Sequence, residues 1–105
     1  MERLEKLNML QSVFSEKKKF IGDGYYRIRS IDDVTLELTF LIAGSCGETI
    51  VHPQITVTLD QSQAIGTKLI DMDTSPPKFL YRNSSNADEI DDALDNLIEK
   101  FLRIK

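Results

Sequence analysis

The sequence has few of the residues on which crosslinked and metal-bound domains depend. Its 105 residues include one cysteine and one histidine. One thiol cannot form an internal disulfide, and two such residues cannot supply the roughly four ligands of a structural zinc site. A single cysteine is also compatible with a reducing compartment. The sequence therefore predicts no metal, no cofactor and no disulfide.

Long apolar runs are absent as well. No stretch of about 18 consecutive apolar residues occurs, so no membrane-spanning helix is predicted. The first residues alternate charged and apolar groups and lack the apolar core of a signal peptide. We expect an intracellular protein, in the cytoplasm or nucleus, with no membrane partner.

Basic residues are the minority among the charges. Thirteen Lys and Arg stand against 17 Asp and Glu, a net charge of −4. Because phosphate binding requires clustered cations, this balance predicts no nucleic-acid partner. The only basic cluster is Lys17-Lys18-Lys19, interpreted as a helix end where cations complement exposed carbonyl groups.

The length and apolar content fit one globular domain spanning residues 1–105. Apolar residues make up 41% and charged residues 29% of the chain, an ordinary composition for a folded protein. A chain of this size buries a sufficient core without crosslinks. We therefore expect one domain, with no repeat and no linker.

Residues 2 to about 20 are predicted to form a helix that ends before Gly22. At about 100° per residue its apolar positions cover roughly 220° of the circumference, about twice what one core-facing stripe needs. We therefore predict that the helix packs on its own sheet and also binds a partner. An equally compatible alternative is that some of these residues are isolated at the surface. The apolar positions are Leu4, Leu7, Met9, Leu10, Val13 and Phe14, of which the first five are the predicted partner-binding residues.

From residue 25 the pattern changes to the alternation typical of strands. Strands are predicted over 25–31, 34–42 and 49–59, with a fourth over 67–72. Pro53 cannot donate to a strand ladder, which predicts a bulge or an edge position there. Residues 74–77 include two prolines and are expected to be extended.

The C-terminal segment is predicted to form a helix that only packs on the sheet. Asn86 is a plausible N-cap, with Glu89 three residues later in a capping-box arrangement. One face is apolar, with Ile90, Ala93, Leu94, Leu97, Ile98, Phe101 and Leu102. The predicted fold class is α+β: a helix, an antiparallel sheet of three to four strands, and a C-terminal helix.

The sequence contains few residues arranged as in known catalytic or ligand-binding sites. Cys46 and His52 could form a nucleophile pair, but no third group to orient the histidine is evident, so a loop thiol and an unrelated histidine are favoured. The acidic residues of 88–95 do not have the spacing of a calcium loop and suit a solvated helix start. An RNA-binding sheet could stack bases on Tyr25, Tyr26, Arg27 and Arg29, but paired aromatics and a basic surround are missing. We predict that the protein is not an enzyme.

The element order, with Pro76-Pro77 before the last helix, resembles that of RWD-type domains. Within that fold, residues 26–32, 55–60 and 68–73 are similar to the globular heads of kinetochore proteins, including Spc-type subunits and checkpoint-scaffold and monopolin heads. The chain departs from them in a longer, glycine-rich connection over 43–53. The resemblance implies a head that follows a coiled coil, pairs with a sister head and binds partner peptides.

RWD domains are related to ubiquitin-conjugating enzymes, and His52-Pro53-Gln54 is similar to the His-Pro-Asn motif of those enzymes. Their catalytic cysteine follows the motif, whereas Cys46 precedes it here, so the resemblance implies a non-catalytic relative. The leading hypothesis is a protein-interaction adaptor, a homo- or heterodimer through the N-terminal helix, in a kinetochore or other nuclear assembly. The alternative is a small acidic microbial binder, such as a secretion chaperone or a toxin-immunity protein.

Overall fold

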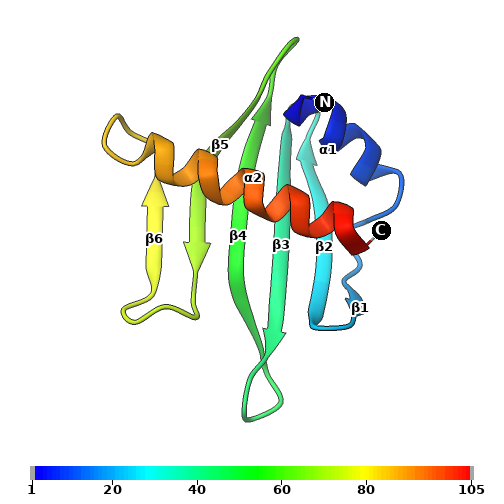
Figure 1. Cartoon of the computed structure of the whole chain (residues 1–105), viewed down its shortest axis with the longest axis vertical. Helices are drawn as coiled ribbons and strands as arrows, with labels where there is room; N and C mark the ends of the chain where they lie inside the picture. Colours follow the sequence, from blue (N-terminus) through cyan, green and yellow to red (C-terminus); the bar gives the residue numbers. More distant parts are fainter. Residues whose placement is uncertain (1, 105) are drawn as a thin grey trace.

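A computed structural model describes residues 2–104, and it shows one antiparallel sheet with both helices packed on the same side (Figure 1). The strands lie in the sheet in the order of the chain, each antiparallel to the next. The predicted α+β class with a helix at each end is confirmed, but the sheet has six strands. The elements are α1 (Arg3–Gln11), β1 (Lys19–Ile21), β2 (Gly24–Asp32), β3 (Thr35–Ala43), β4 (Thr49–Leu59), β5 (Ala64–Asp71), β6 (Lys78–Tyr81) and α2 (Ala87–Ile104).

The four predicted strands correspond to β2, β3, β4 and β5. The two additional strands are the sheet edges, β1 with three residues and β6 with four. Segments this short do not show a period of two, and their pairing with β2 and β5 defines them as strands. The expectation of three to four strands was therefore too low.

Pro53 lies in a bulge, one of the two predicted positions. β4 is an interior strand between β3 and β5, so an edge position is excluded. Thr39 pairs with Gln54 and Leu41 pairs with Val51, which leaves one extra residue on β4 at this point. The bulge accommodates a residue that has no N–H to donate.

The N-terminal helix is much shorter than predicted, because α1 ends at Gln11. Ser12 donates its hydroxyl to the Met9 carbonyl, which gives the backbone an alternative to continuing the helix. Phe14 then turns into the core, where its ring lies 5.0 Å from that of Phe101. The lysine cluster follows outside the helix, so its interpretation as a helix end is wrong.

The core lies between the sheet and the two helices. α2 crosses the strands obliquely and presents the apolar face expected of it (Figure 1). Its start differs from the prediction: the Asn86 amide binds the backbone of Asn83 and Tyr81, and Glu89 binds Lys78, so the capping box is not formed. The largest fully buried side chains are Tyr26, Phe101, Leu7, Leu10, Leu38, Ile55, Ile90, Leu94, Ile98 and Val57.

Neither helix of the part of the chain described here has the length and apolar character needed to cross a membrane.

Candidate protein-binding surface

The predicted partner-binding residues of the N-terminal segment are mostly directed inward. Leu7 and Leu10 are fully buried in the core, and Leu4 and Met9 are partly buried. Val13 is 41% exposed but lies beyond the end of α1. The wide apolar arc assumed a helix that continues through residue 14, and it does not continue. The arc by itself therefore gives no reason for a partner on α1.

Charged contacts further tie α1 to α2. The Arg3 guanidinium donates to Asp95 at 2.8 Å, and the Lys6 ammonium donates to Glu99 at 2.7 Å. Because these side chains lie across the junction of the two helices, they fix α1 against the C-terminal helix. The junction of α1 with α2 is thus an internal contact of the domain.

Both helices lie on one side of the sheet, and we call the opposite side the open face (Figure 1). Strand register places Tyr25 beside Leu41, Gln54 beside Ile70, and Ile70 beside Phe79, all pointing away from the buried face. Phe79 is 58% exposed. The open face consists of Phe20, Tyr25, Arg27, Arg29, Glu37, Thr39, Leu41, Gln54, Thr56, Lys68, Ile70, Phe79 and Tyr81.

Aromatic side chains occupy both margins of the open face. At the β1 margin, Phe20 is 60% exposed and its ring stands edge-on to that of Tyr25, with centroids 5.2 Å apart. At the β6 margin, Tyr81 is 68% exposed, and the Lys68 ammonium lies 5.5 Å from its ring centroid. The sequence prediction noted Tyr25 only, because the edge strands that carry the other rings were not identified.

A polar network fills the centre of the open face. Arg27 and Arg29 both approach one carboxylate, that of Glu37, at 3.9 and 3.7 Å. The Thr39 hydroxyl, fully buried, donates to the Gln54 amide oxygen at 3.1 Å. The Nε of Arg27 is buried and has no acceptor among residues 2–104. The face therefore combines apolar margins with hydrogen-bonding groups between them.

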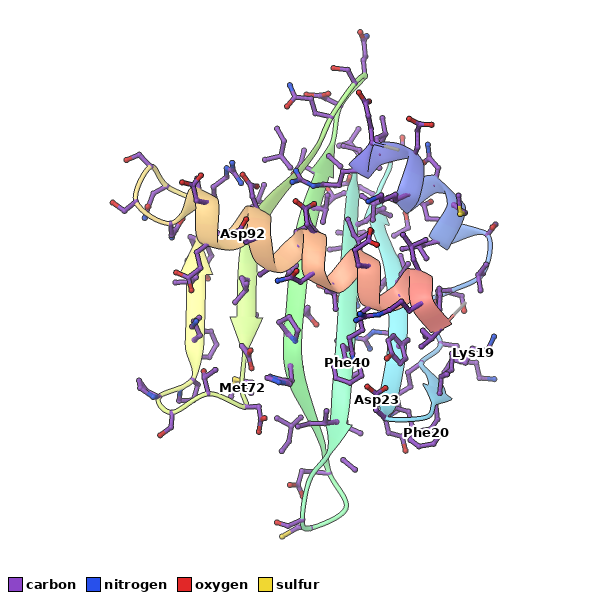
Figure 2. The ribbon with its side chains drawn as sticks, viewed as in Figure 1. Lys19, Phe20, Asp23, Phe40, Met72 and Asp92 are labelled. Atoms are coloured by element: carbon purple, nitrogen blue, oxygen red, sulfur yellow. The ribbon has the colours of Figure 1, made fainter. Side chains whose placement is uncertain are left out.

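The lysine cluster lies at the β1 end of this surface. All three lysines are exposed. Lys17 and Lys18 directly precede β1, and Lys19 is its first residue. Figure 2 shows Lys19 and Phe20 at this edge of the sheet. The Lys18 ammonium lies 4.9 Å from the ring centroid of Tyr25. Cations and aromatic rings thus meet at one margin.

Cys46 and His52 have separate surroundings. Cys46 is exposed in the turn between β3 and β4, with its sulfur 3.9 Å from the Ser45 hydroxyl. The Nδ1 of His52 lies 2.7 Å from the Asp71 carboxylate, and its Nε2 lies 3.8 Å from Asp73. Spacing along the sequence gave no signal for the Asp71 contact. Among residues 2–104 no hydrogen bond joins the Cys46 sulfur to the His52 ring, whose two nitrogens face carboxylates instead.

The acidic residues at the start of α2 are largely engaged by cations. Glu89 accepts from Lys78 at 2.9 Å and Asp91 accepts from Arg82 at 2.8 Å. The Arg82 hydrogen bond lowers the pKa of the Asp91 carboxyl. These pairs attach α2 to β6 and its following loop. Within residues 2–104, no group of three or more His, Cys, Asp or Glu side chains is arranged to hold a metal ion.

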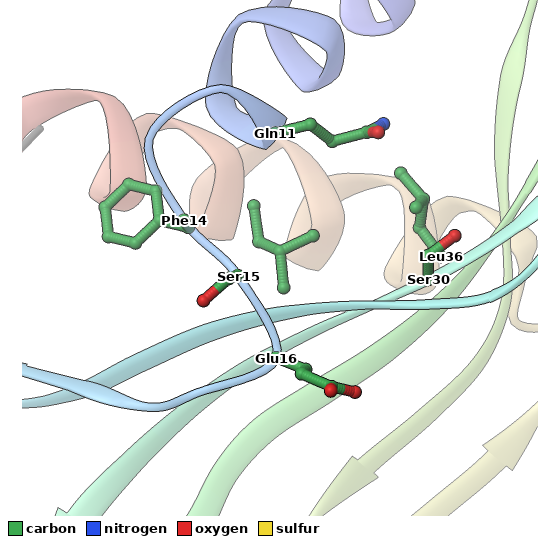
Figure 3. Close-up of a pocket in the computed structure, with 7 residues that line it drawn as sticks. Gln11, Phe14, Ser15, Glu16, Ser30 and Leu36 are labelled. Carbon is green, nitrogen blue, oxygen red and sulfur yellow. The ribbon is translucent and has the colours of Figure 1, made fainter.

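A hollow of about 290 Å³ opens on the helix side, between the end of α1 and strands β2 and β3 (Figure 3). Its floor is formed by core residues, and Glu16 is its single charged residue. One carboxylate among apolar and neutral groups supplies neither an acid–base pair nor a ligand set. The lining residues are Gln11, Phe14, Ser15, Glu16, Ile28, Ser30 and Leu36.

Comparison with known proteins identifies no relative: no family model, no curated protein and no solved structure matches the chain.

Proposed function

We propose that the chain is a non-catalytic protein-binding domain and that the open face of the sheet is its binding surface. The observation that carries this proposal is the exposure of Phe20, Phe79 and Tyr81 on the sheet face opposite both helices. An antiparallel sheet that simply faces water has mainly polar side chains on that side. Exposed aromatic rings are instead characteristic of protein interfaces.

The composition of the open face supports this function further. Aromatic residues and arginine are enriched at protein interfaces, and a few aromatic anchors dominate binding energy. Here Phe79 and Tyr81 supply such anchors at one margin, and Arg27 lies in the polar centre. Arg29, whose side chain is 48% exposed, is the group between the margins that is most open to a partner.

The RWD-like resemblance extends the proposal to a dimeric adaptor in a kinetochore or other nuclear assembly. The order of a helix, an antiparallel meander and a final helix supports it, whereas six strands exceed the number expected. In that hypothesis a coiled coil precedes the domain, and pairing involves the α1 region. Leu4, Met9 and Val13 are the predicted partner-binding residues that retain exposed apolar surface for such pairing.

The test compares two double variants on opposite sides of the molecule. Phe79→Ser with Tyr81→Ser alters the open face, and Asp88→Asn with Asp92→Asn alters the exposed side of α2, where Figure 2 labels Asp92. Proteins retained by the immobilised wild-type chain are purified, and their affinity for each variant is measured by calorimetry. Loss of two anchor rings is expected to weaken binding about thirtyfold or more.

The α2 variant serves as the matched control, and it should bind as the wild type does. Unchanged binding by the open-face variant would contradict the proposal. Binding lost only in the α2 variant would instead favour the acidic-binder hypothesis. Circular dichroism of both variants confirms that the fold is retained.

A further inference from the structure

The lysine cluster, Lys17 to Lys19, does not lie at a helix end, so it does not stabilise exposed helix carbonyl groups. The last turn of α1 contains no basic residue, and Lys17, Lys18 and Lys19 follow beyond its end. No carboxylate of residues 2–104 forms an ion pair with any of the three. In a chain of net charge −4, the three form a local concentration of positive charge without an internal partner.

The lysines line a hollow of about 250 Å³ together with Val13, Phe14 and Ser15. Small-molecule sites usually exceed about 300 Å³. This hollow therefore suits one or two side chains of a larger partner. We call the surface formed by Val13, Lys17, Lys18, Lys19, Phe20 and Tyr25 the basic edge.

Apolar groups accompany the charges on the basic edge. Val13 and Phe20 are 41% and 60% exposed. The long aliphatic stem of a lysine such as Lys18, laid over the Tyr25 ring, adds further apolar surface beneath its ammonium group. A partner that contacts this edge meets both apolar surface and positive charge.

The nearest carboxylates along the chain are those of Asp23 and Glu16. Asp23, in the turn after β1, accepts from the Lys100 ammonium at 2.7 Å and from the Tyr26 hydroxyl at 2.8 Å. The Lys100 hydrogen bond, followed by that of Tyr26, lowers the pKa of the Asp23 carboxyl. Glu16 lines the hollow on the helix side (Figure 3). Neither carboxylate forms an ion pair with Lys17, Lys18 or Lys19.

We infer that the basic edge binds an acidic segment of a partner protein, whose carboxylates meet the lysines and whose apolar side chain enters the hollow lined by Val13 and the three lysines. The inference rests on the proposed protein-binding function and adds the chemistry of the partner. Complementary charge raises the rate and specificity of such an association.

The surroundings favour an acidic protein segment over a nucleic acid. A single-stranded nucleic acid needs a continuous cationic track and free aromatic faces. Beyond the basic edge the track is interrupted by Glu37, which occupies Arg27 and Arg29. One face of the Tyr25 ring already carries Lys18. Three lysines are also fewer than the four to eight of typical anionic-membrane motifs.

The experiment measures the fluorescence anisotropy of a labelled, capped peptide, Asp-Glu-Asp-Phe-Glu-Asp-Glu, with its Asn/Gln counterpart as the uncharged control. Lys17→Gln, Lys18→Gln and Lys19→Gln together remove the cluster. The matched variant Gln61→Glu, Gln63→Glu and Ser84→Glu changes the net charge equally at exposed positions away from it. Short oligothymidylate and phosphatidylserine-containing vesicles are the competing probes.

We expect the acidic peptide to bind the wild type and the matched variant, and to bind the lysine variant about tenfold more weakly. Added salt should weaken the wild-type interaction. Equal loss in both variants, or tighter binding of oligothymidylate or vesicles, would overturn the inference. So would the absence of peptide binding, but the proposed function would stand if Phe79 and Tyr81 still determined binding of the purified partner.

Discussion

Replacing Phe14 by alanine tests where α1 ends and what the chain does next. The Phe14 side chain is only 4% exposed, and its ring packs edge-on against Phe101 at 5.0 Å and near Tyr26 at 6.2 Å. Truncating a buried phenylalanine costs about 3–5 kcal/mol. A domain of this size has a total stability of about 5–15 kcal/mol, so Phe14→Ala should lower Tm by roughly 15–30 °C. Val13→Ala, at the exposed neighbouring position, should change stability by at most about 0.5 kcal/mol.

Urea denaturation followed by circular dichroism measures both variants. An unchanged slope with denaturant would show that the variants differ in stability alone. Phe14→Leu retains burial but loses the ring contacts, so its cost should be intermediate, about 1 kcal/mol. Equal costs for Val13→Ala and Phe14→Ala would refute the geometry, because Phe14 would then be no more buried in the core than Val13.

Three further predictions concern the sheet, the start of α2 and the thiol. Gly24→Ala would place a methyl carbon 2.5 Å from the Leu41 carbonyl oxygen, so denaturation should show a loss of about 1–3 kcal/mol. Asp91→Asn should cost about 1 kcal/mol at neutral pH, because the Arg82 hydrogen bond holds the pKa of Asp91 below its unfolded value. That contribution is present above the unfolded pKa of about 3.9 and is lost as the pH falls through the folded pKa, so wild type and variant should converge in acid; a constant difference would contradict the assignment. Cys46→Ser, at an exposed turn, should leave stability and partner binding unchanged, and reduced binding would show that the thiol has a role.

The parts of the fold that the sequence predicts are those with a long, regular pattern. Along 34–42 five apolar residues occupy alternate positions, and the structure has β3 there. The apolar face of α2 spans four turns, so the pattern identifies it even though the capping residues behave differently. In both elements burial of one face determines the structure, and that burial is visible in the order of residues.

The parts that the sequence does not predict depend on distant contacts. β1 and β6 form because β2 and β5 have backbone N–H and C=O groups with which they can pair, and three or four residues contain too little pattern to reveal this. Their rings, Phe20 and Phe79, were therefore absent from the predicted site. Leu7 and Leu10 point into the core, which is compatible with the helical pattern. Whether these side chains pack in the core or bind a partner could be decided only from the position of α2.

The end of α1 also determines the role of the lysine cluster. On a helix that continued to residue 20, the three lysines would complement the final carbonyl groups and have no further role. Burial of Phe14 ends the helix early, and the Ser15 carbonyl then accepts a hydrogen bond from Ile28 at 3.0 Å. This contact holds the segment beside β2, so that Lys19 enters β1 and Phe20 comes to face Tyr25. The same packing that completes the core therefore places positive charge without an ion-pair partner next to exposed aromatic side chains. As a result the basic edge adjoins the open face, and the two surfaces share Phe20 and Tyr25.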